Sequence, residues 1–404
     1  MVAVSEAQHA ARERHIIIIG GGIIGAATAH YLASHPARNG AAISLFETSY
    51  QIAPGASSKA GGFLASDWHD DDTASLAELS FRLHSELADE HGGQTKWGYR
   101  RLKTYDADID NTITPANHDV GELDWIDPSV LSSEPSVLGD EKTTAQVTPG
   151  LLSEFLIQHA RDKLNVSIRL GTAVRHIQTD QDGRVASVVV TEGGGNPEEI
   201  AATDIIVCAG PWTGDFFHNS IEATSPLRNL PFVRTATRIE GKRAHSIIVK
   251  GMRRTGNHAL FVTKMSYRAA RSAVKAGSPE FYCRADGTVY ICGAADGEHL
   301  PHTADDVEVS DRQIEKLVEQ AAVISPQVLG PQAAIVHRQA CFLPMSEATG
   351  SPIINYSAQT GLGVAAGHTC WGITLSLGTG KVMSELIFDG AALSADISLL
   401  DGSD

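Results

Sequence analysis

Apolar and polar positions alternate along the chain in a way that separates short strands from helices. The first apolar run, His15–Ile19, contains four consecutive isoleucines and is typical of a parallel strand buried on both faces. The helix formers and small residues of Ala26–Leu32 follow it, and a second apolar strand is expected over Ala42–Phe46. This order predicts a βαβ unit at the start of the fold.

The rest of the pattern predicts a mixture of helices and strands. Residues 70–92 are expected to form a surface helix, because their leucines and one phenylalanine fall on one face. Other helices are expected over Leu151–Leu164, 311–324 and Thr379–Phe388. Strands are expected near 166–170 and 185–191, and over Asp204–Val207, Thr288–Cys292 and Gly363–Ala366, with a β-like stretch over 228–295. The small residues of Pro54–Gly62 argue against a regular element there, and 100–147 has no clear pattern.

A glycine motif joins the first strand to the first helix. Gly20 allows a tight turn, Gly22 lets the backbone approach a pyrophosphate, and Gly25 lets helix and strand pack closely. Glu47 ends the second strand, at the distance where an acid accepts from a ribose hydroxyl. An acid at this place disfavours NADP, but NAD and FAD share the motif.

Two further stretches favour FAD over NAD. The small-residue loop Ser57–Gly62 follows the second strand at once and suits the close approach of a bulky cofactor, whereas a nicotinamide enzyme usually continues with further βα units. The C-terminal stretch Gly361–Glu385 contains a strand, a glycine-rich loop and the start of a helix, whose N-terminus would stabilise negative charge on a reduced flavin. A nicotinamide enzyme is the alternative.

Composition and charge narrow the class of protein. The 404 residues suggest two or three structural units, and the formal net charge of −16 disfavours nucleic acid and anionic lipid as partners. No apolar run reaches the length of about 20 residues that a membrane helix needs. Five cysteines without a CxxC pair favour a reducing compartment. Met1–Arg14 lacks the apolar core of a secretory signal, so an intracellular, cytoplasmic location is expected.

These motifs resemble the D-amino-acid-oxidase superfamily of FAD-dependent oxidoreductases, and most closely its glycine oxidase and sarcosine oxidase branch. The resemblance lies in Ile16–Gly25, Glu47, Gly55–Gly62, Val207–Thr213, Arg284–Gly293 and Gly361–Glu385. It implies an α/β fold, α+β overall, in which a Rossmann-like FAD-binding domain is interleaved with a β-rich substrate domain. The implied FAD-binding domain comprises 14–66, 147–220 and 330–395, the substrate domain comprises 67–146 and 221–329, and terminal tails cover 1–13 and 396–404.

The resemblance also implies the residues that contact FAD. At the dinucleotide end these are Gly20, Gly22, Ile23, Ile24, Gly25, Glu47 and Val174. Along the pyrophosphate and flavin they are Ser57, Ser58, Lys59, Ala60, Gly61 and Gly62, together with Ala209, Gly210 and Trp212 of a later turn. Near the pyrimidine edge of the flavin they are Gly367, His368, Gly372, Ile373 and Thr374.

Cys341 resembles the cysteine that carries covalent flavin in sarcosine-oxidase-like enzymes. The alternative interpretation is a small thiol buried in the core.

Other positions depart from the family. Leu343 stands where glycine-oxidase-like enzymes hold the substrate carboxylate with an arginine, and Thr374 stands where sarcosine oxidases use a lysine. No lysine follows the Tyr290–Gly293 strand, where the resemblance would place one that speeds the reaction with oxygen. Three arginines, Arg338, Arg243 and Arg284, remain as carboxylate anchors that the sequence does not distinguish.

His368, Trp371 and His69 are the candidate catalytic residues. His368 lies in the predicted flavin loop, and His69 and Trp371 are candidates for the pocket wall. Hydride transfer from a neutral amine needs geometry more than a base, so a structural role is the alternative for His368. Asp70, Asp71 and Asp72 are interpreted as a solvated helix start, and no metal site is expected.

The resemblance implies oxidation of the C–N bond of a small amine or amino acid, by hydride transfer to flavin N5. The product is an imine, and oxygen is the expected acceptor. Two alternatives stay open: a flavin dehydrogenase with another acceptor, and a low-turnover FAD-binding protein in regulation or trafficking. The sequence indicates no oligomeric state.

Overall fold

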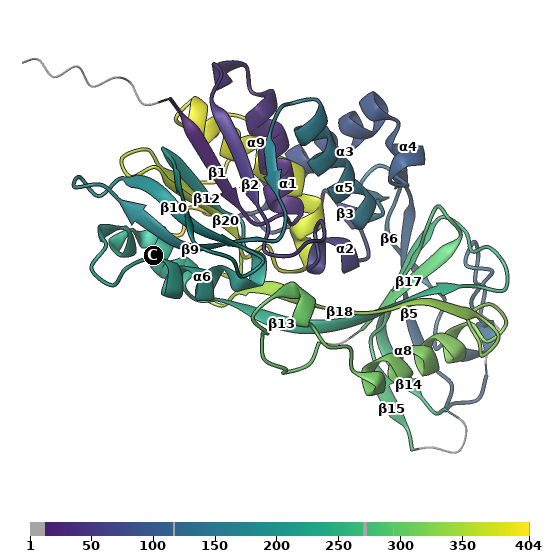
Figure 1. Ribbon diagram of the computed structural model, residues 1–404. Coiled ribbons are helices and arrows are strands. Elements are labelled where there is room, and N and C mark those ends of the chain that lie inside the picture. Colours follow the sequence, from purple (N-terminus) through teal and green to yellow (C-terminus); the bar gives the residue numbers. More distant parts are fainter. Residues whose placement is uncertain (1–12, 116–117, 270–272, 294, 404) are drawn as a thin grey trace, which may run out of the picture.

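Two sheets at opposite ends of the molecule organise the fold, and the long strands β13 (Ile239–Lys250) and β18 (Ala334–Ser346) run between them (Figure 1). The computed structural model describes residues 13–115, 118–269, 273–293 and 295–403. The expectations for Met1–Arg14 and for the tail 1–13 therefore lie almost entirely outside the described residues.

A six-stranded sheet contains the predicted βαβ unit. Its order is β19-β20-β12-β1-β2-β8, and its neighbours are parallel except for β19 with β20. Ile16 and Ile18 of β1 pack into a core shared with helices, whereas Ile17 and Ile19 pack into a core on the opposite face. The isoleucine run is therefore buried on both sides. The strands are β1 (His15–Ile19), β2 (Ala42–Phe46), β8 (Ser167–Arg169), β12 (Asp204–Val207), β19 (Ile353–Ser357) and β20 (Leu362–Ala366).

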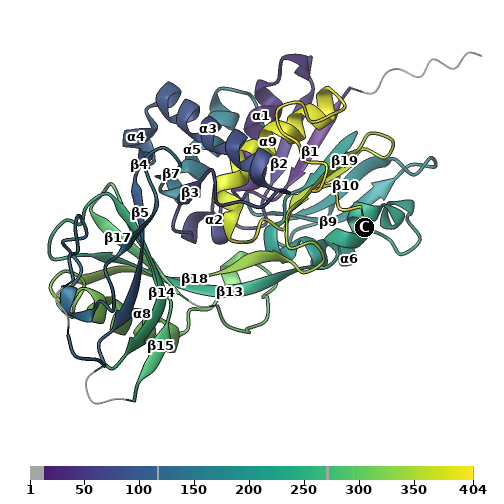
Figure 2. The ribbon, with the colours of Figure 1, turned by 180° about the vertical axis from the view of Figure 1, so that it is seen from behind.

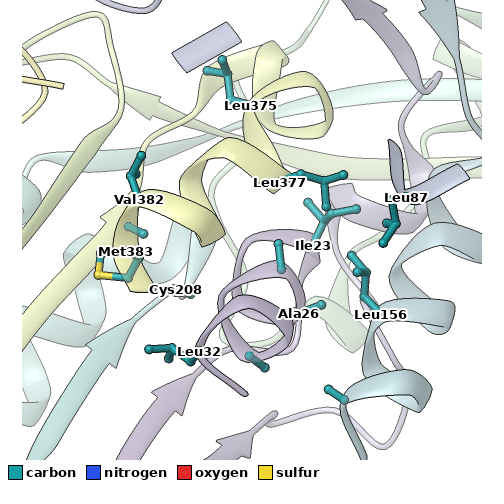
Figure 3. Packing of buried hydrophobic residues seen from close by; sticks show 14 of the residues in the cluster. Ile23, Ala26, Leu32, Leu87, Leu156, Cys208, Leu375, Leu377, Val382 and Met383 are labelled. Carbon is teal, nitrogen blue, oxygen red and sulfur yellow. The ribbon is translucent and has the colours of Figure 1, made fainter. Parts of the chain in front are cut away.

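Helices cover one face of this sheet. They are α1 (Ile23–Ser34), α3 (Ala74–His91), α5 (Pro149–Asp162) and α9 (Gly372–Phe388). Figure 3 shows the apolar side chains of this layer packed around α1. Small residues bring α1 and α9 together, since a Cβ on Gly380 would lie 2.5 Å from the carbonyl carbon of Ala27. No helix within the described ranges is long and apolar enough to cross a membrane.

A three-stranded antiparallel sheet and two short helices cover the other face. Their apolar residues form one core with Ile17, Ile19 and Val207 of the parallel sheet. The elements are β9 (Thr172–Thr179), β10 (Val185–Glu192), β11 (Glu198–Ala201), α6 (Thr213–Ser220) and α7 (Pro231–Ala236).

The second large sheet presents one face to a helix and the other toward the first unit. Helix α8 (Asp311–Ile324) packs on the outer face, where it shares a core with Phe281, Cys283 and Ile291. Tyr282 and Tyr290 belong to the inner face. The order is β18-β13-β17-β16-β14-β5-β6, with β15 paired to β14. The remaining strands are β5 (Lys103–Asp110), β6 (Ser136–Gly139), β14 (His258–Tyr267), β15 (Lys275–Gly277), β16 (Glu280–Cys283) and β17 (Thr288–Cys292).

A small sheet lies between the two large ones (Figure 2). It consists of β3 (Phe63–Ala65), β7 (Thr144–Gln146) and β4 (Arg100–Arg101). The short helix α2 (Ala56–Lys59) precedes β3, and α4 (Gly93–Lys96) precedes β4. The small sheet therefore begins directly after the small-residue loop that follows β2.

Several sequence predictions are confirmed and others are wrong. The strands His15–Ile19, Ala42–Phe46, Asp204–Val207 and Thr288–Cys292 and the helix 311–324 have the predicted bounds. The expectation that Pro54–Gly62 holds no regular element is wrong, because α2 forms there. The helix predicted from Thr379 begins at Gly372, since packing of Gly378 and Gly380 against neighbouring helices outweighs their low helix propensity.

Helix α3 bears on the predicted domain boundary. It lies within 67–146, a range predicted to join the substrate domain, yet Leu76 and Leu87 pack in the helical layer of the parallel sheet. A Cβ on Gly378 of α9 would lie 2.9 Å from the Leu76 carbonyl oxygen. The division into domains stays a prediction.

We expect Gly380→Ala to lower the free energy of unfolding by about 1–3 kcal/mol, because the added methyl group meets the backbone of α1. Urea unfolding followed by circular dichroism measures this change. Gly297→Ala is the matched control, since Gly297 is exposed and a Cβ there meets nothing within 4 Å. Equal stability of the two variants would contradict the close contact of α1 and α9.

Candidate functional site

A cavity of about 510 Å³ opens at the carboxyl ends of the parallel strands. Its lining includes Ile19 at the end of β1, Phe46 at the end of β2, Cys208 after β12 and Ala366 at the end of β20. Ligands of open α/β sheets bind at this edge. The cavity is therefore the candidate cofactor site.

The glycine turn after β1 is held by backbone contacts that leave no room for side chains. Gly20 has a φ of +110°, and a Cβ on it would lie 2.3 Å from the carbonyl oxygen of Cys208. A Cβ on Gly25 would lie 1.9 Å from the Gly20 carbonyl oxygen. Only glycine fits at both places, so the start of α1 is fixed against the sheet.

The first turn of α1 points into the cavity. Gly22, Ile23 and Ile24 line it, and the Ser57 hydroxyl oxygen accepts a hydrogen bond of 2.9 Å from the Ile23 N–H. The first N–H groups of a helix lack partners within the helix and favour an anion such as a pyrophosphate. Ser57 brings the small-residue loop to the same place.

Glu47 at the end of β2 closes the turn from the other side. Its carboxylate accepts from the Gly21 N–H at 2.7 Å and from the Ser49 N–H at 2.9 Å. Burial raises the pKa of this carboxyl group. Glu47 also lines the cavity, where its oxygens are in place to accept from a ribose.

A segment far along the chain, residues 301–305, covers the cavity, and we call it the cover. His302, Thr303 and Ala304 belong to the lining. The Trp212 indole N–H donates to the Pro301 carbonyl oxygen at 2.7 Å, and the Ser49 hydroxyl donates to Asp305 at 2.8 Å. Two bonds thus hold the segment over the dinucleotide end.

The chain matches the family model DAO, described as FAD-dependent oxidoreductase, over residues 15–386. The chain belongs to this family. Within the DAO family the cofactor is FAD, and the glycine turn, Glu47 and the start of α1 at the cavity fit that group. The nicotinamide alternative is therefore wrong.

Relatives and solved structures agree with this membership. The chain is 37% identical to an oxidoreductase of Schizosaccharomyces pombe, across 96% of this chain and 97% of the relative. It resembles the crystal structure of glycine oxidase from Geobacillus kaustophilus with a TM-score of 0.72 and 19% identity, covering 95% of this chain and 97% of that chain. L-proline dehydrogenase from P. horikoshii has a TM-score of 0.70 and 15% identity, with 97% of both chains covered. These structures share the DAO fold.

Many predicted FAD contacts come together in the cavity. They are Gly20, Gly22, Ile23, Ile24, Glu47, Ser57, Ala60, Val174, Ala209, Gly210, Trp212, His368, Gly372 and Ile373. The other predicted contacts lie outside its lining: Gly25, Ser58, Lys59, Gly61, Gly62, Cys341, Gly367 and Thr374.

Packing explains several of the residues outside the lining. A Cβ on Gly62 would lie 2.0 Å from the Val147 carbonyl oxygen, and the Thr374 hydroxyl donates to the Phe63 carbonyl oxygen at 3.2 Å. These residues shape the loop, and their contact with FAD stays a prediction.

The sequence reasoning did not find the cover or several residues that line the cavity. The cover is missed because its place is set by Trp212 and Ser49, both distant in sequence. The missed lining residues include Thr48, Thr172, Arg175, His176, Asp215, Phe216, Asn219, Ser220, His302, Thr303, Ala304 and Thr369.

The three candidate catalytic side chains have different surroundings. The His368 ring is 2% exposed, its Nε2 lies 3.0 Å from the Thr379 hydroxyl, and burial lowers its pKa to about 3, so the ring is neutral. His69 and Trp371 lie outside the cavity lining, with ring centroids 4.5 Å apart. Burial lowers the pKa of His69 as well. The geometry favours the structural interpretation of His368, and the catalytic roles stay predictions.

The three candidate anchors for a carboxylate are separated by the structure. Arg338 is paired with Asp311, and Arg243 makes two bonds of 2.9 Å to Asp296. Arg284 is 7% exposed and donates to the Ala60 carbonyl oxygen at 3.3 Å. Its guanidinium lies 5.2 Å from the ring centre of Tyr290. Arg284 thus fastens the small-residue loop to the second sheet.

Cys341 lies on β18 two residues before Leu343, which lines the cavity. Its thiol is 7% exposed, and burial raises its pKa to about 11. Lys59 lies close enough to lower that pKa in part. Covalent attachment of FAD at this thiol stays a prediction.

For Glu47→Gln we expect FAD affinity to fall about ten- to a hundredfold, because a charged acceptor for the ribose and for two backbone N–H groups is lost. Fluorescence titration of apoprotein with FAD measures the affinity. Exposed Glu222→Gln is the control for the loss of one negative charge. Unchanged affinity of the Glu47 variant would refute its place at the ribose.

The covalent hypothesis predicts that acid precipitation leaves the yellow flavin with the protein pellet. Cys341→Ser then releases it into the supernatant, whereas Cys292→Ser, on β17 and separated from β18 by β13, does not. The flavin absorbance of the pellet and of the supernatant shows whether FAD is covalently attached. Yellow supernatant from the unaltered protein would show that no thioether forms.

Proposed function

We propose that the protein oxidises the C–N bond of a small amine or amino acid to an imine and passes the electrons to oxygen. Bound FAD supplies the acceptor for the hydride that leaves the carbon beside nitrogen. The observation that supports this most is the single cavity that joins the dinucleotide end at Glu47 to Ala60, Leu343 and Ile373 at the far end. Relatives of similar fold are named glycine oxidase and L-proline dehydrogenase, which act on amino acids.

In this proposal the residues of the chain hold the reacting groups in position and surround them with a medium of low dielectric constant. Tyr290 donates to the Lys59 carbonyl oxygen at 3.0 Å, and Arg284 donates to that of Ala60, so the loop beside the cavity is rigid. A neutral, buried His368 adds no charge next to the reacting carbon. Transfer of a hydride from a neutral amine requires such alignment more than it requires a base.

We also propose the assignment of the two domains that the resemblance implies, one to the cofactor and one to the substrate. The stretches 14–66, 147–220 and 330–395 bind FAD, and 67–146 and 221–329 shape the substrate side. The inner face of the second sheet meets the loop at Gly61, where a Cβ would lie 2.5 Å from the Tyr282 ring. This contact supports a substrate position between the two.

A second acceptor is supported by one observation. No lysine follows the Tyr290–Gly293 strand, where the resemblance would place one that speeds the reaction with oxygen. Without that lysine we expect a slower reaction with oxygen. A dehydrogenase that uses a quinone or a protein is therefore the second candidate.

We expect anaerobic mixing of the holoenzyme with a panel of amines and amino acids to bleach the flavin absorbance near 450 nm, an approximate wavelength typical of oxidised flavins. Readmission of air restores the colour within seconds if oxygen is the acceptor. If the protein is a dehydrogenase, a soluble quinone restores the flavin colour faster than air does. A flavin that no compound bleaches would contradict both and favour the low-turnover FAD-binding protein.

A further inference from the structure

A set of aromatic side chains lies next to the cavity but outside its lining. We call Phe63, Trp68, Phe261, Tyr282 and Trp371 the aromatic rim. They come from β3, the loop after it, β14, β16 and the loop before α9. Phe63, Trp68, Phe261 and Trp371 are all partly exposed, whereas most large aromatic residues near them are buried. Rings in this state are open to a ligand.

The rim is continuous from one element to the next. Phe63 has its ring centroid 5.1 Å from that of Trp68 and 5.7 Å from that of Tyr282. Phe261 lies 5.3 Å from Trp68 and 5.8 Å from Tyr282. Trp68 lies 6.5 Å from Trp371, which directly follows the cavity residue Cys370. The rim therefore joins the second sheet to the edge of the cavity.

Glu280 is the acidic residue of this region. It stands opposite Phe261 and Cys292 on the inner face of the sheet. Its carboxylate accepts from the Tyr282 hydroxyl at 2.5 Å and lies 3.5 Å from the Cys292 sulfur. Both partners are neutral donors, so the negative charge is not compensated by them.

The negative charge of Glu280 also affects Cys370, which lies on a different part of the chain. Burial raises the pKa of the Cys370 thiol, and the Glu280 carboxylate raises it further. Tyr282 and Cys292 also have raised pKa values, first from burial and then from Glu280. Glu280 therefore lies near Cys370, which lines the cavity.

Three nearby arginines have other partners. Arg284 donates to the Ala60 carbonyl oxygen and lies over Tyr290. The described ion pairs of Arg243 and Arg338 are with Asp296 and Asp311. These arginines therefore do not neutralise the Glu280 carboxylate.

We propose that the aromatic rim and Glu280 bind a cationic ammonium group of the substrate, at a distance from the C–N bond that is oxidised. The substrate is then an amine that carries a second positive charge in place of a carboxylate. This rests on the proposed amine oxidation. Aromatic faces attract cations through their quadrupole, and a carboxylate adds a direct charge contact. An anionic group in the same place meets repulsion from Glu280.

Three compounds of equal chain length test the inference: 1,5-diaminopentane, 1-aminohexane and 6-aminohexanoate. Each is mixed with the holoenzyme without oxygen over a range of concentrations. The dissociation constant is read from the concentration dependence of the bleaching rate, or of the spectral perturbation where a compound does not bleach the flavin. We expect 1,5-diaminopentane to bind about tenfold more tightly than 1-aminohexane, and 6-aminohexanoate to bind weakest. Equal binding of the first two overturns the inference.

Variants test which residue causes the tighter binding of 1,5-diaminopentane. Glu280→Gln is expected to bring the ratio between the first two compounds to about one. Glu315→Gln is the matched control, because this exposed residue of α8 lies on the helix that covers the opposite face of the sheet. The control retains the full ratio. An unchanged ratio in Glu280→Gln overturns the assignment to this residue.

Trp68→Leu is a second variant that does not depend on the Tyr282–Glu280 hydrogen bond. Loss of its π face is expected to weaken 1,5-diaminopentane several-fold and to leave 1-aminohexane nearly unchanged. If both compounds weaken equally, the rim acts by apolar contact alone and the inference fails.

Bleaching and binding separate the two proposals. If no compound bleaches the flavin yet the charge preference appears, the amine oxidation fails and the cation site stands. If all three bleach it without preference, the oxidation stands and the cation site fails.

Discussion

The close approach of three backbone segments sets the geometry on which the site depends. Gly20 lies against the carbonyl of Cys208, and Gly25 lies against the carbonyl of Gly20, so β1, the start of α1 and the end of β12 meet without side chains between them. The N-terminus of α1 is thereby held at the edge of the sheet, where its first residues line the cavity. Any larger residue at these points would move the helix, and with it the place of the pyrophosphate.

A second close approach couples the cofactor end to the substrate side. Gly61 packs on Tyr282 and Tyr290, and its loop is tied down by bonds from Tyr290 and from Arg284. The loop that borders the cavity is therefore also part of the wall of the second sheet. A shift of that sheet is transmitted to the loop through backbone carbonyls, which do not yield as a flexible side chain would. The side chains on the inner face of the sheet are in this way held at a fixed distance from the cavity.

What the sequence predicts well is information carried by neighbouring residues. The isoleucine strand, the glycine turn and Glu47 lie within 33 residues of one another, and each has a local physical reason. They predict a dinucleotide site, whereas the choice of FAD and the resemblance to the family also needed later stretches such as Gly55–Gly62 and Gly361–Glu385. The cover over the cavity was not predictable, because Trp212 and Ser49 hold it by bonds between distant segments. The early start of α9 at Gly372 had the same cause, since its glycines are favoured by packing against α1 and α3 and not by helix propensity.

The departures from the family acquire a physical meaning when charges are compared across the site. With Leu343 at the place of the expected arginine, the cavity lining has no cation there. Arg243 and Arg338, both on the second large sheet, pair with Asp296 and with Asp311 at the start of α8. Arg284 is buried behind the loop, where it stabilises backbone. Glu280, among aromatic rings, is not neutralised by any of these three arginines. In the proposed function, a site with Leu343 in place of an arginine and with Glu280 nearby recognises a cationic group and not a carboxylate, because the sign of the charge that faces the substrate is reversed.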